Sequence, residues 1–169
     1  MGETDDTEIF RLARDTNQAV ALANACFDEL LPHLMSILPS GTEIRHVGAT
    51  AVPGCLTKGD LDIAVRVERL AFPAADAILT QQFARNTGSV RTSDFAAFED
   101  AGSHPPLGIQ LVVTGSAYDD FHRFADSLRA DATLVDAYNV LKRRFNGQPM
   151  QDYRDAKGAF VERVLARRK

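Results

Sequence analysis

The segment from Asp60 to Val67 alternates between apolar residues and polar or small ones, and it constrains the fold more than any other stretch. Successive side chains of a β-strand point to opposite faces, so this period of two predicts a strand with one buried face. Residues two apart project to the same side, about 6.6 Å from each other along the strand. The sequence therefore predicts that the carboxylates of Asp60 and Asp62 aim at one point.

The loop that precedes this strand, residues 48–59, contains three glycines and a proline. Gly48 has no Cβ, so backbone amides beside it can approach a phosphate closely, and Thr50 offers a hydroxyl donor. Ala49 keeps the turn small, and Lys58 places a positive charge just before Asp60. The loop therefore predicts a phosphate-binding turn.

Paired carboxylates with open coordination positions suit a divalent cation of the magnesium type, which completes its shell with water and substrate phosphate. Asp60 and Asp62 are therefore candidate ligands of Mg²⁺ or Mn²⁺, and a metal–NTP complex is the ligand that fits loop and strand together. An isolated Asp-x-Asp on a strand is more often a plain polar face. The glycine turn upstream at this spacing favours a binding site.

The remaining periodicities predict an α+β domain. Helical spacing covers residues 17–38, with Pro32 expected to kink or divide the helix and residues 39–41 to end it. A short strand is expected at 43–47, a helix at 73–83, and an antiparallel pair of strands at 90–98 and 108–113. Three helices should follow, begun by a capping box at Ser116 and Asp119, by a cap at Asp131, and by Pro149. The prediction is a small mixed or antiparallel sheet packed by helices, with a helical C-terminal half.

Length and composition indicate a single domain spanning residues 1–169. The net charge of −4 argues against broad nucleic-acid binding, which needs a basic surface. No stretch is long and apolar enough to span a membrane, and the acidic N-terminus lacks the pattern of a signal peptide. Two cysteines suggest reduced thiols, so we expect a cytoplasmic protein.

The run HVGATAVPGCLTKGDLDIAV (46–65) fits the nucleotidyltransferase superfamily signature and more closely resembles the GrpB-like family. The tail from Tyr138 is similar to that family's ending, with Lys142, Tyr153, Lys157 and Phe160 in the expected places. The likeness covers roughly residues 20–168. It implies a nucleotidyltransferase-like fold and a reaction assigned from the superfamily, with an NTP and an unknown acceptor as substrates.

Two positions depart from the pattern that the resemblance implies, and a third acid is missing. Ala49 replaces the usual Ser, while Asp60 adds an acid that many GrpB-like proteins lack. A third carboxylate is normally expected on a later strand, where the polar, site-facing residue here is Gln110. Asp94, Glu99 and Asp100 are the candidates to substitute for it, and spacing selects none of the three.

Three further residues are candidate phosphate contacts. His46 precedes the glycine turn, although a histidine within a strand is more often a hydrogen-bonded structural residue. Lys142 and Lys157 are either solvated helix charges or cations that reach across the cleft to the triphosphate.

Two functions lead on these residues, ahead of a purely structural interaction protein, which would require a solvated acidic pair and a loop that binds no anion. The first is a metal-dependent nucleotidyltransferase that moves a nucleoside monophosphate from an NTP to an unknown acceptor, with Asp60 and Asp62 as the catalytic metal ligands. The alternative is a catalytically weak nucleotide-binding or regulatory module on the same fold. A third acid close to Asp60 and Asp62 would favour the enzyme, whereas Gln110 alone would favour the binding module.

Overall fold

The computed structural model describes residues 8–167; the acidic residues 1–7, on which the expectation about a signal peptide rested, lie outside it. The described chain forms five strands, five helices and two short 3₁₀ turns. In chain order the elements are α1 (Thr16–Ile37), β1 (Glu43–Val47), η1 (Ala49–Ala51), β2 (Leu61–Val67), η2 (Arg69–Ala71), α2 (Phe72–Gln82), β3 (Ala84–Arg85), β4 (Phe95–Asp100), β5 (Leu107–Val113), α3 (Phe121–Ala130), α4 (Ala132–Phe145) and α5 (Met150–Ala166).

The five strands form one open sheet in the order β1-β2-β5-β4-β3. The central pair β2 and β5 is parallel, and every other pair is antiparallel. Asp62 is paired with Val47 on one side and with Gly108 on the other. The register thus places Asp62 in the middle of the sheet, between two neighbouring strands.

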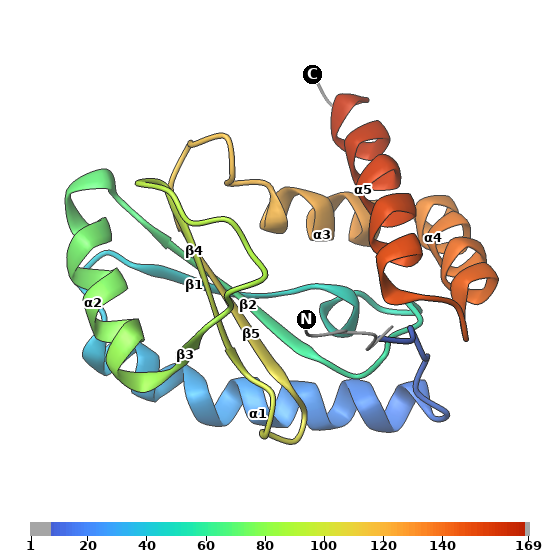
Figure 1. Ribbon diagram of the computed structural model, residues 1–169, viewed down its shortest axis with the longest axis horizontal. Coiled ribbons are helices and arrows are strands. Elements are labelled where there is room, and N and C mark those ends of the chain that lie inside the picture. Colours follow the sequence, from blue (N-terminus) through green and yellow to red (C-terminus); the bar gives the residue numbers. More distant parts are fainter. Residues whose placement is uncertain (1–7, 168–169) are drawn as a thin grey trace, which may run out of the picture.

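Helices cover both faces of this sheet (Figure 1). One face buries the alternating apolar residues of β2 and β5 against α1 and α2, and this cluster is the main core. The opposite face carries Asp62, and the C-terminal helices α3, α4 and α5 gather beside it around a second apolar cluster. The polar face of β2 therefore faces the space between the sheet and the C-terminal helices.

The α+β prediction is confirmed, including the mixed sheet and the helical C-terminal half. The expected division of the first helix at Pro32 is wrong, because α1 continues through it as one element. A proline removes a single backbone donor, and buried Ala23 and Leu34 fix the helix to the sheet on both sides of it. The caps at Asp131 and Pro149 lie where the sequence placed them.

Two local predictions differ from the structure. The expected capping box is wrong, because α3 begins after Asp120 and Asp119 instead accepts hydrogen bonds from Arg66 and from the Gly115 amide. The guanidinium on β2 offers two charged donors, which are stronger partners than a helix amide. The strand expected from Val90 begins only at Phe95, since Val90 is exposed and forms part of the loop after the short edge strand β3.

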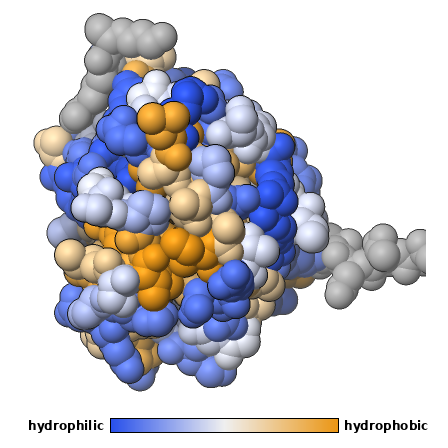
Figure 2. All heavy atoms as spheres, turned by 90° about the vertical axis from the view of Figure 1, so that its left-hand side faces the viewer, coloured by the Kyte–Doolittle hydropathy of each residue, from blue (hydrophilic) through white to orange (hydrophobic). Residues whose placement is uncertain are grey.

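The face of the molecule in Figure 2 is mostly hydrophilic. Figure 2 shows one face on which apolar atoms gather in a continuous area within polar surroundings. No helix among residues 8–167 is both long enough and apolar enough to cross a membrane.

Candidate functional site

The two acids and three lysines named by the sequence meet at one small cavity of about 60 Å³, which we call the lysine cavity. Asp60 lies just before β2, Asp62 lies within it, and Lys58 comes from the preceding loop. Lys142 is contributed by α4 and Lys157 by α5. The cavity is completed by Phe10, Ala49, Thr57, Tyr138 and Tyr153. Residues far apart in the chain thus surround the acidic pair with positive charge.

Asp62 is held between two glycines. A Cβ added to Gly48 would lie 2.6 Å from Asp62 Oδ2, and one added to Gly108 would lie 2.9 Å from Asp62 Oδ1. Gly48 also has a φ of +75° and a ψ of −174°, a backbone conformation accessible almost only to glycine. The glycine turn therefore makes room for the carboxylate, in addition to the predicted contact with phosphate.

Burial raises the pKa of Asp62, and the neighbouring Asp60 raises it further, while Lys157, Lys58 and Lys142 lower it. None of the described residues donates a hydrogen bond to this carboxylate or forms an ion pair with it. A carboxylate desolvated in this way is stabilised by a cation placed beside it.

The donor set fits a hard divalent cation. Asp60 and Asp62 supply carboxylate oxygens only, and among residues 8–167 no group of three or more His, Cys, Asp or Glu side chains is arranged to hold a metal. Mg²⁺ is commonly held by one or two carboxylates and completed by water and phosphate. The Lys58 ammonium lies 2.9 Å from Asp60 Oδ2, so a metal bound there would replace this ion pair.

His46 and Thr50 form a hydrogen-bonded clamp on the loop. Thr50 Oγ1 donates to the carbonyl oxygen of Asp60 at 3.0 Å and lies 2.8 Å from His46 Nε2. Since the hydroxyl proton goes to Asp60, the His46 ring donates to Thr50 and must be protonated on Nε2. Burial, with a smaller contribution from Arg129, lowers the pKa of His46 to about 4, so the ring is neutral. The two side chains fix Asp60, and their phosphate contact stays a prediction.

Lys142 is not a solvated helix charge. Its side chain is only 3% exposed, Nζ donates to the Leu56 carbonyl at 2.6 Å, and the ammonium lies 4.3 Å from the centre of the Tyr138 ring. Burial lowers its pKa to about 8. The interpretation of Lys142 as a surface charge is therefore wrong, whereas Lys157 is half-buried and reaches the cavity from α5.

No third acid joins Asp60 and Asp62 in the described part of the chain. Gly108 occupies the position beside Asp62 on β5, and Gln110 is paired with Ala64 two residues further along. Asp94 forms an ion pair with the exposed Arg69, and Glu99 is separated from Asp62 by Gly108. A site without a third acid close to Asp60 and Asp62 is the arrangement that favours a binding module over an enzyme.

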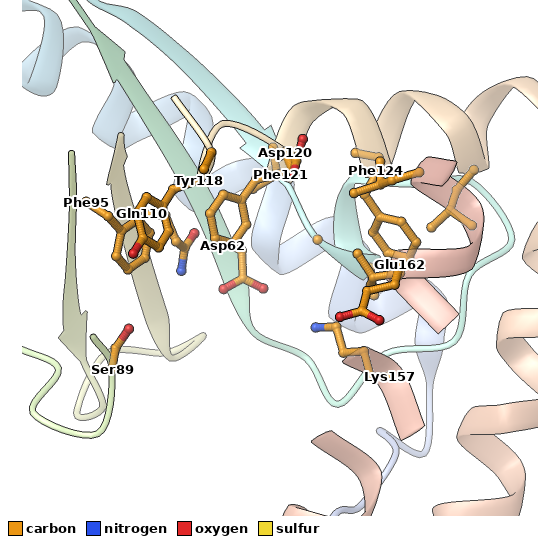
Figure 3. A pocket seen from close by; sticks show the side chains of 18 of the residues that line it. Asp62, Ser89, Phe95, Gln110, Tyr118, Asp120, Phe121, Phe124, Lys157 and Glu162 are labelled. Carbon is orange, nitrogen blue, oxygen red and sulfur yellow. The ribbon is translucent and has the colours of Figure 1, made fainter. Parts of the chain in front are cut away.

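A second, larger cavity of about 490 Å³ opens beside Asp62 between the sheet and helices α3 and α5. Figure 3 shows Asp62 with aromatic side chains on both sides, and Lys157 and Glu162 projecting towards it from α5. Its aromatic lining consists of Phe95, Tyr118, Phe121, Phe124 and Tyr138. Except for Tyr138, sequence reasoning gave these residues no role in a site. The aromatic spacing of residues 118–124, directly after a strand that faces the acids, is the signal that could have indicated them.

The family model described as "GrpB protein" matches residues 21–167, which is most of the chain. The chain belongs to the GrpB family. A UPF0157 protein of Vibrio cholerae is 35% identical over 133 residues, covering 78% of this chain and 70% of the relative. A UPF0157 protein of Streptomyces coelicolor is 28% identical over 140 residues, covering 79% and 73%.

Solved structures show the same fold at low sequence identity. The GrpB protein of Enterococcus faecalis superposes with a TM-score of 0.65 at 19% identity, covering 84% of this GrpB chain and 89% of that one. The Cid1 poly(U) polymerase bound to Mg 3′-dATP gives a TM-score of 0.50 at 14% identity, covering 75% of this chain and 41% of that one. This member of the GrpB family therefore has a nucleotidyltransferase-like fold.

Proposed function

We propose that this chain binds a nucleoside triphosphate as its magnesium or manganese complex at the lysine cavity. The observation that carries the proposal is the convergence of Asp60 and Asp62 with Lys58, Lys142 and Lys157 around one space. The acids hold the metal, the lysines hold the phosphates, and the glycine turn at Gly48 lets the ligand approach the backbone. Magnesium-bound nucleotide in the Cid1 structure, on the same fold, supports the choice of ligand.

The chemistry of each group fits this division. A triphosphate carries several negative charges, and Lys142 is desolvated, so its ammonium interacts with an anion more strongly than a surface lysine does. The metal neutralises part of the phosphate charge and relieves the desolvated Asp62 carboxylate. The larger cavity beside Tyr138 and Lys157 has room for the nucleoside.

Nucleotide binding is tested by thermal unfolding with each of the four NTPs, with and without Mg²⁺. At a ligand concentration about 100 times the Kd, we expect the Tm to rise by roughly 5–10 °C, and only when metal is present. Asp62→Asn should abolish the metal-dependent rise, while Asp136→Asn, on an exposed position of α4, should retain it. A rise that Asp62→Asn leaves unchanged would sink the proposed site.

Nucleotidyl transfer is the second candidate. It is favoured by the Asp60 and Asp62 pair within the superfamily pattern and by a cavity large enough to admit a second substrate. The acceptor's hydroxyl oxygen would bond to the α-phosphorus, the bond to the bridging oxygen would break, and pyrophosphate would leave with its electron pair while the hydroxyl proton passes to water. The absence of a third acid among the described residues favours binding without turnover.

Transfer is separated from binding by the position of the label. The pure protein is incubated with Mn²⁺ or Mg²⁺, cell extract, and NTP labelled on either the α- or the γ-phosphate. A transferase attaches only the α-label to a product, in an amount that depends on Asp62. A binding module yields no labelled product beyond that formed by the Asp62→Asn variant.

A further inference from the structure

The larger cavity has a part that the lysine cavity does not share, and we call it the aromatic half. It is lined by Ser89 and Phe95, by Gln110 from β5, by Tyr118 in the turn before α3, and by Phe121, the first residue of α3. Figure 3 shows Ser89, Phe95, Gln110 and Tyr118 on one side of Asp62, Phe121 next to it, and Phe124, Lys157 and Glu162 on the other side. The aromatic half therefore lies across Asp62 from the lysine on α5.

The walls of the aromatic half are rigid rings. The Phe95 ring centre lies 5.2 Å from that of Tyr118 and 6.0 Å from that of Phe121, and both pairs are nearly parallel. Phe95 is buried and packs with Ala97 and Val112 on the sheet. Flat rings held in this way present a preformed surface to another flat or apolar molecule.

One polar atom in this wall lacks a partner. Gln110 Oε1 is buried and accepts no hydrogen bond from any described residue. A buried acceptor without a donor costs free energy, and a ligand that supplies an N–H or O–H group removes that cost. Gln110 lies two residues beyond Gly108 on β5, and its amide nitrogen Nε2 lies 3.3 Å from where a Cβ on Gly108 would be, next to the Asp62 carboxylate.

The charges around the two cavities differ. Lys58, Lys142 and Lys157 all line the lysine cavity, whereas among residues 8–167 Lys157 is the only cation that lines the larger one. Asp120 and Glu162 add negative charge to the larger cavity, although Asp120 is paired with Arg123. An anionic ligand is therefore attracted to the lysine cavity and disfavoured in the aromatic half.

We propose that the aromatic half binds a second small molecule, flat or apolar, neutral or cationic, that donates a hydrogen bond to Gln110 Oε1 while the nucleotide occupies the other side of Asp62. The nucleotide's place rests on the proposed function, whereas the apolar site does not. If the protein transfers nucleotidyl groups, this molecule is the acceptor, because the lysines hold the departing phosphates on the opposite side. The same charges disfavour a polyanion such as a strand of RNA at this position.

Two dyes that differ by one charge test the site. N-phenyl-1-naphthylamine is neutral, carries one N–H group and fluoresces in apolar surroundings, and 1-anilinonaphthalene-8-sulfonate has the same rings with an added anion. We expect saturable binding of the neutral dye, and we expect the affinity for the sulfonate to be lower by at least about five-fold. Equal affinity for the two dyes, or no saturable binding of the neutral one, overturns the proposal.

Matched variants locate the dye. Ala117 is exposed at the wall of the larger cavity, so Ala117→Trp should fill it without disturbing the core, and Ala77→Trp on the exposed side of α2 is the control. Neutral-dye binding should be lost in the first variant and kept in the second. Gln110→Met, which removes the acceptor oxygen, should weaken dye binding roughly five-fold.

The dye titration repeated at saturating Mg·ATP separates this proposal from the previous one. Retained dye affinity supports two adjacent sites, and competitive displacement of the dye by Mg·ATP overturns the proposal, since the aromatic half would then hold the nucleotide. If Mg·ATP does not bind at all but the dye binds and Ala117→Trp blocks it, nucleotide binding fails and the apolar site stands.

Discussion

Asp62 lies at the centre of the proposed site and carries a cost in folding stability. Its carboxylate lies between Gly48 and Gly108, is desolvated by burial, and accepts no hydrogen bond from the described residues. Charged groups in such surroundings oppose folding unless a counterion is bound. This pattern is expected where a binding site lowers the folding stability of the unliganded protein.

The first prediction at this scale concerns that cost. Because the pKa of Asp62 is raised in the folded protein, its ionised form opposes folding at neutral pH. Asp62→Asn should therefore stabilise the ligand-free protein by about 1 kcal/mol, or roughly 2–4 °C in Tm. Urea unfolding without metal measures the change, with Asp136→Asn as the surface control. A destabilised Asn variant would contradict the assignment.

His46 predicts how stability depends on pH. Its pKa is about 4 in the folded protein and near 6.5 in the unfolded chain, so below pH 6.5 the unfolded chain takes up a proton that the folded protein refuses. Stability is present above pH 6.5 and falls as the pH drops to 4, by at most about 3 kcal/mol. His46→Gln keeps a donor for Thr50 and should reduce the loss in unfolding free energy between pH 7 and pH 5. An unchanged loss would show that His46 is not the group responsible.

At the scale of elements, the loop between β1 and β2 positions the site. It turns at Gly48, is clamped to Asp60 through Thr50, and is tied to α4 because Asn139 bonds both the Gly54 carbonyl and the Leu56 amide. The loop therefore joins the strand that carries the acids to the helix that carries Lys142.

Substitutions at two glycines with similar φ distinguish the cost of backbone strain from the cost of a steric clash with Asp62. Gly48 has φ +75° and touches Asp62, whereas Gly41 has φ +85° and open space where its Cβ would be. Each change to Ala should cost about 1–3 kcal/mol of backbone strain, and Gly48→Ala should cost more because its Cβ collides with the carboxylate. Urea unfolding of the two variants measures the difference. Adding Asp62→Ala to Gly48→Ala should recover part of it, and equal costs for the two glycines would refute the contact.

At the scale of the whole molecule, the site exists because the sheet and the C-terminal helices meet. Asp62 belongs to β2 and Asp60 directly precedes it, and two of the three lysines belong to α4 and α5. A ligand in the lysine cavity would touch both halves, so binding and the packing between halves should be coupled.

Asn139 tests this coupling. Asn139→Ala leaves the Leu56 amide and the Gly54 carbonyl without their partner, which should cost about 1–3 kcal/mol of unfolding free energy. The variant should also reduce the Tm shift produced by Mg·NTP, because the loop no longer holds Leu56 where Lys142 binds its carbonyl. Val140→Ala, an exposed change on the next residue, should leave both quantities unaltered. If Asn139→Ala keeps the full Tm shift with Mg·NTP, the attachment of the loop to α4 does not contribute to nucleotide binding.

The sequence predicted the parts of the fold that depend on local order. The period of two in Asp60–Val67 gave the strand and put both acids on the polar side, and the helical periods gave the C-terminal half. The prediction failed at Asp119, because its carboxylate accepts hydrogen bonds from Arg66 of β2 and does not cap a helix. It failed at Val90, because β4 begins only at Phe95.

The sequence by itself determined the α+β order of helices and strands, the strand that carries Asp62 with Asp60 directly before it, and the glycine turn upstream, because each follows from neighbours along the chain. The nucleotidyltransferase-like fold was implied by the resemblance to the GrpB-like family. Only the tertiary structure decided that Lys142 is buried, that Gly48 and Gly108 enclose Asp62, and that aromatic residues form a cavity beside it. These properties depend on which elements lie side by side. Burial, close approach and shared cavities arise between segments that are distant in sequence, where periodicity carries no information.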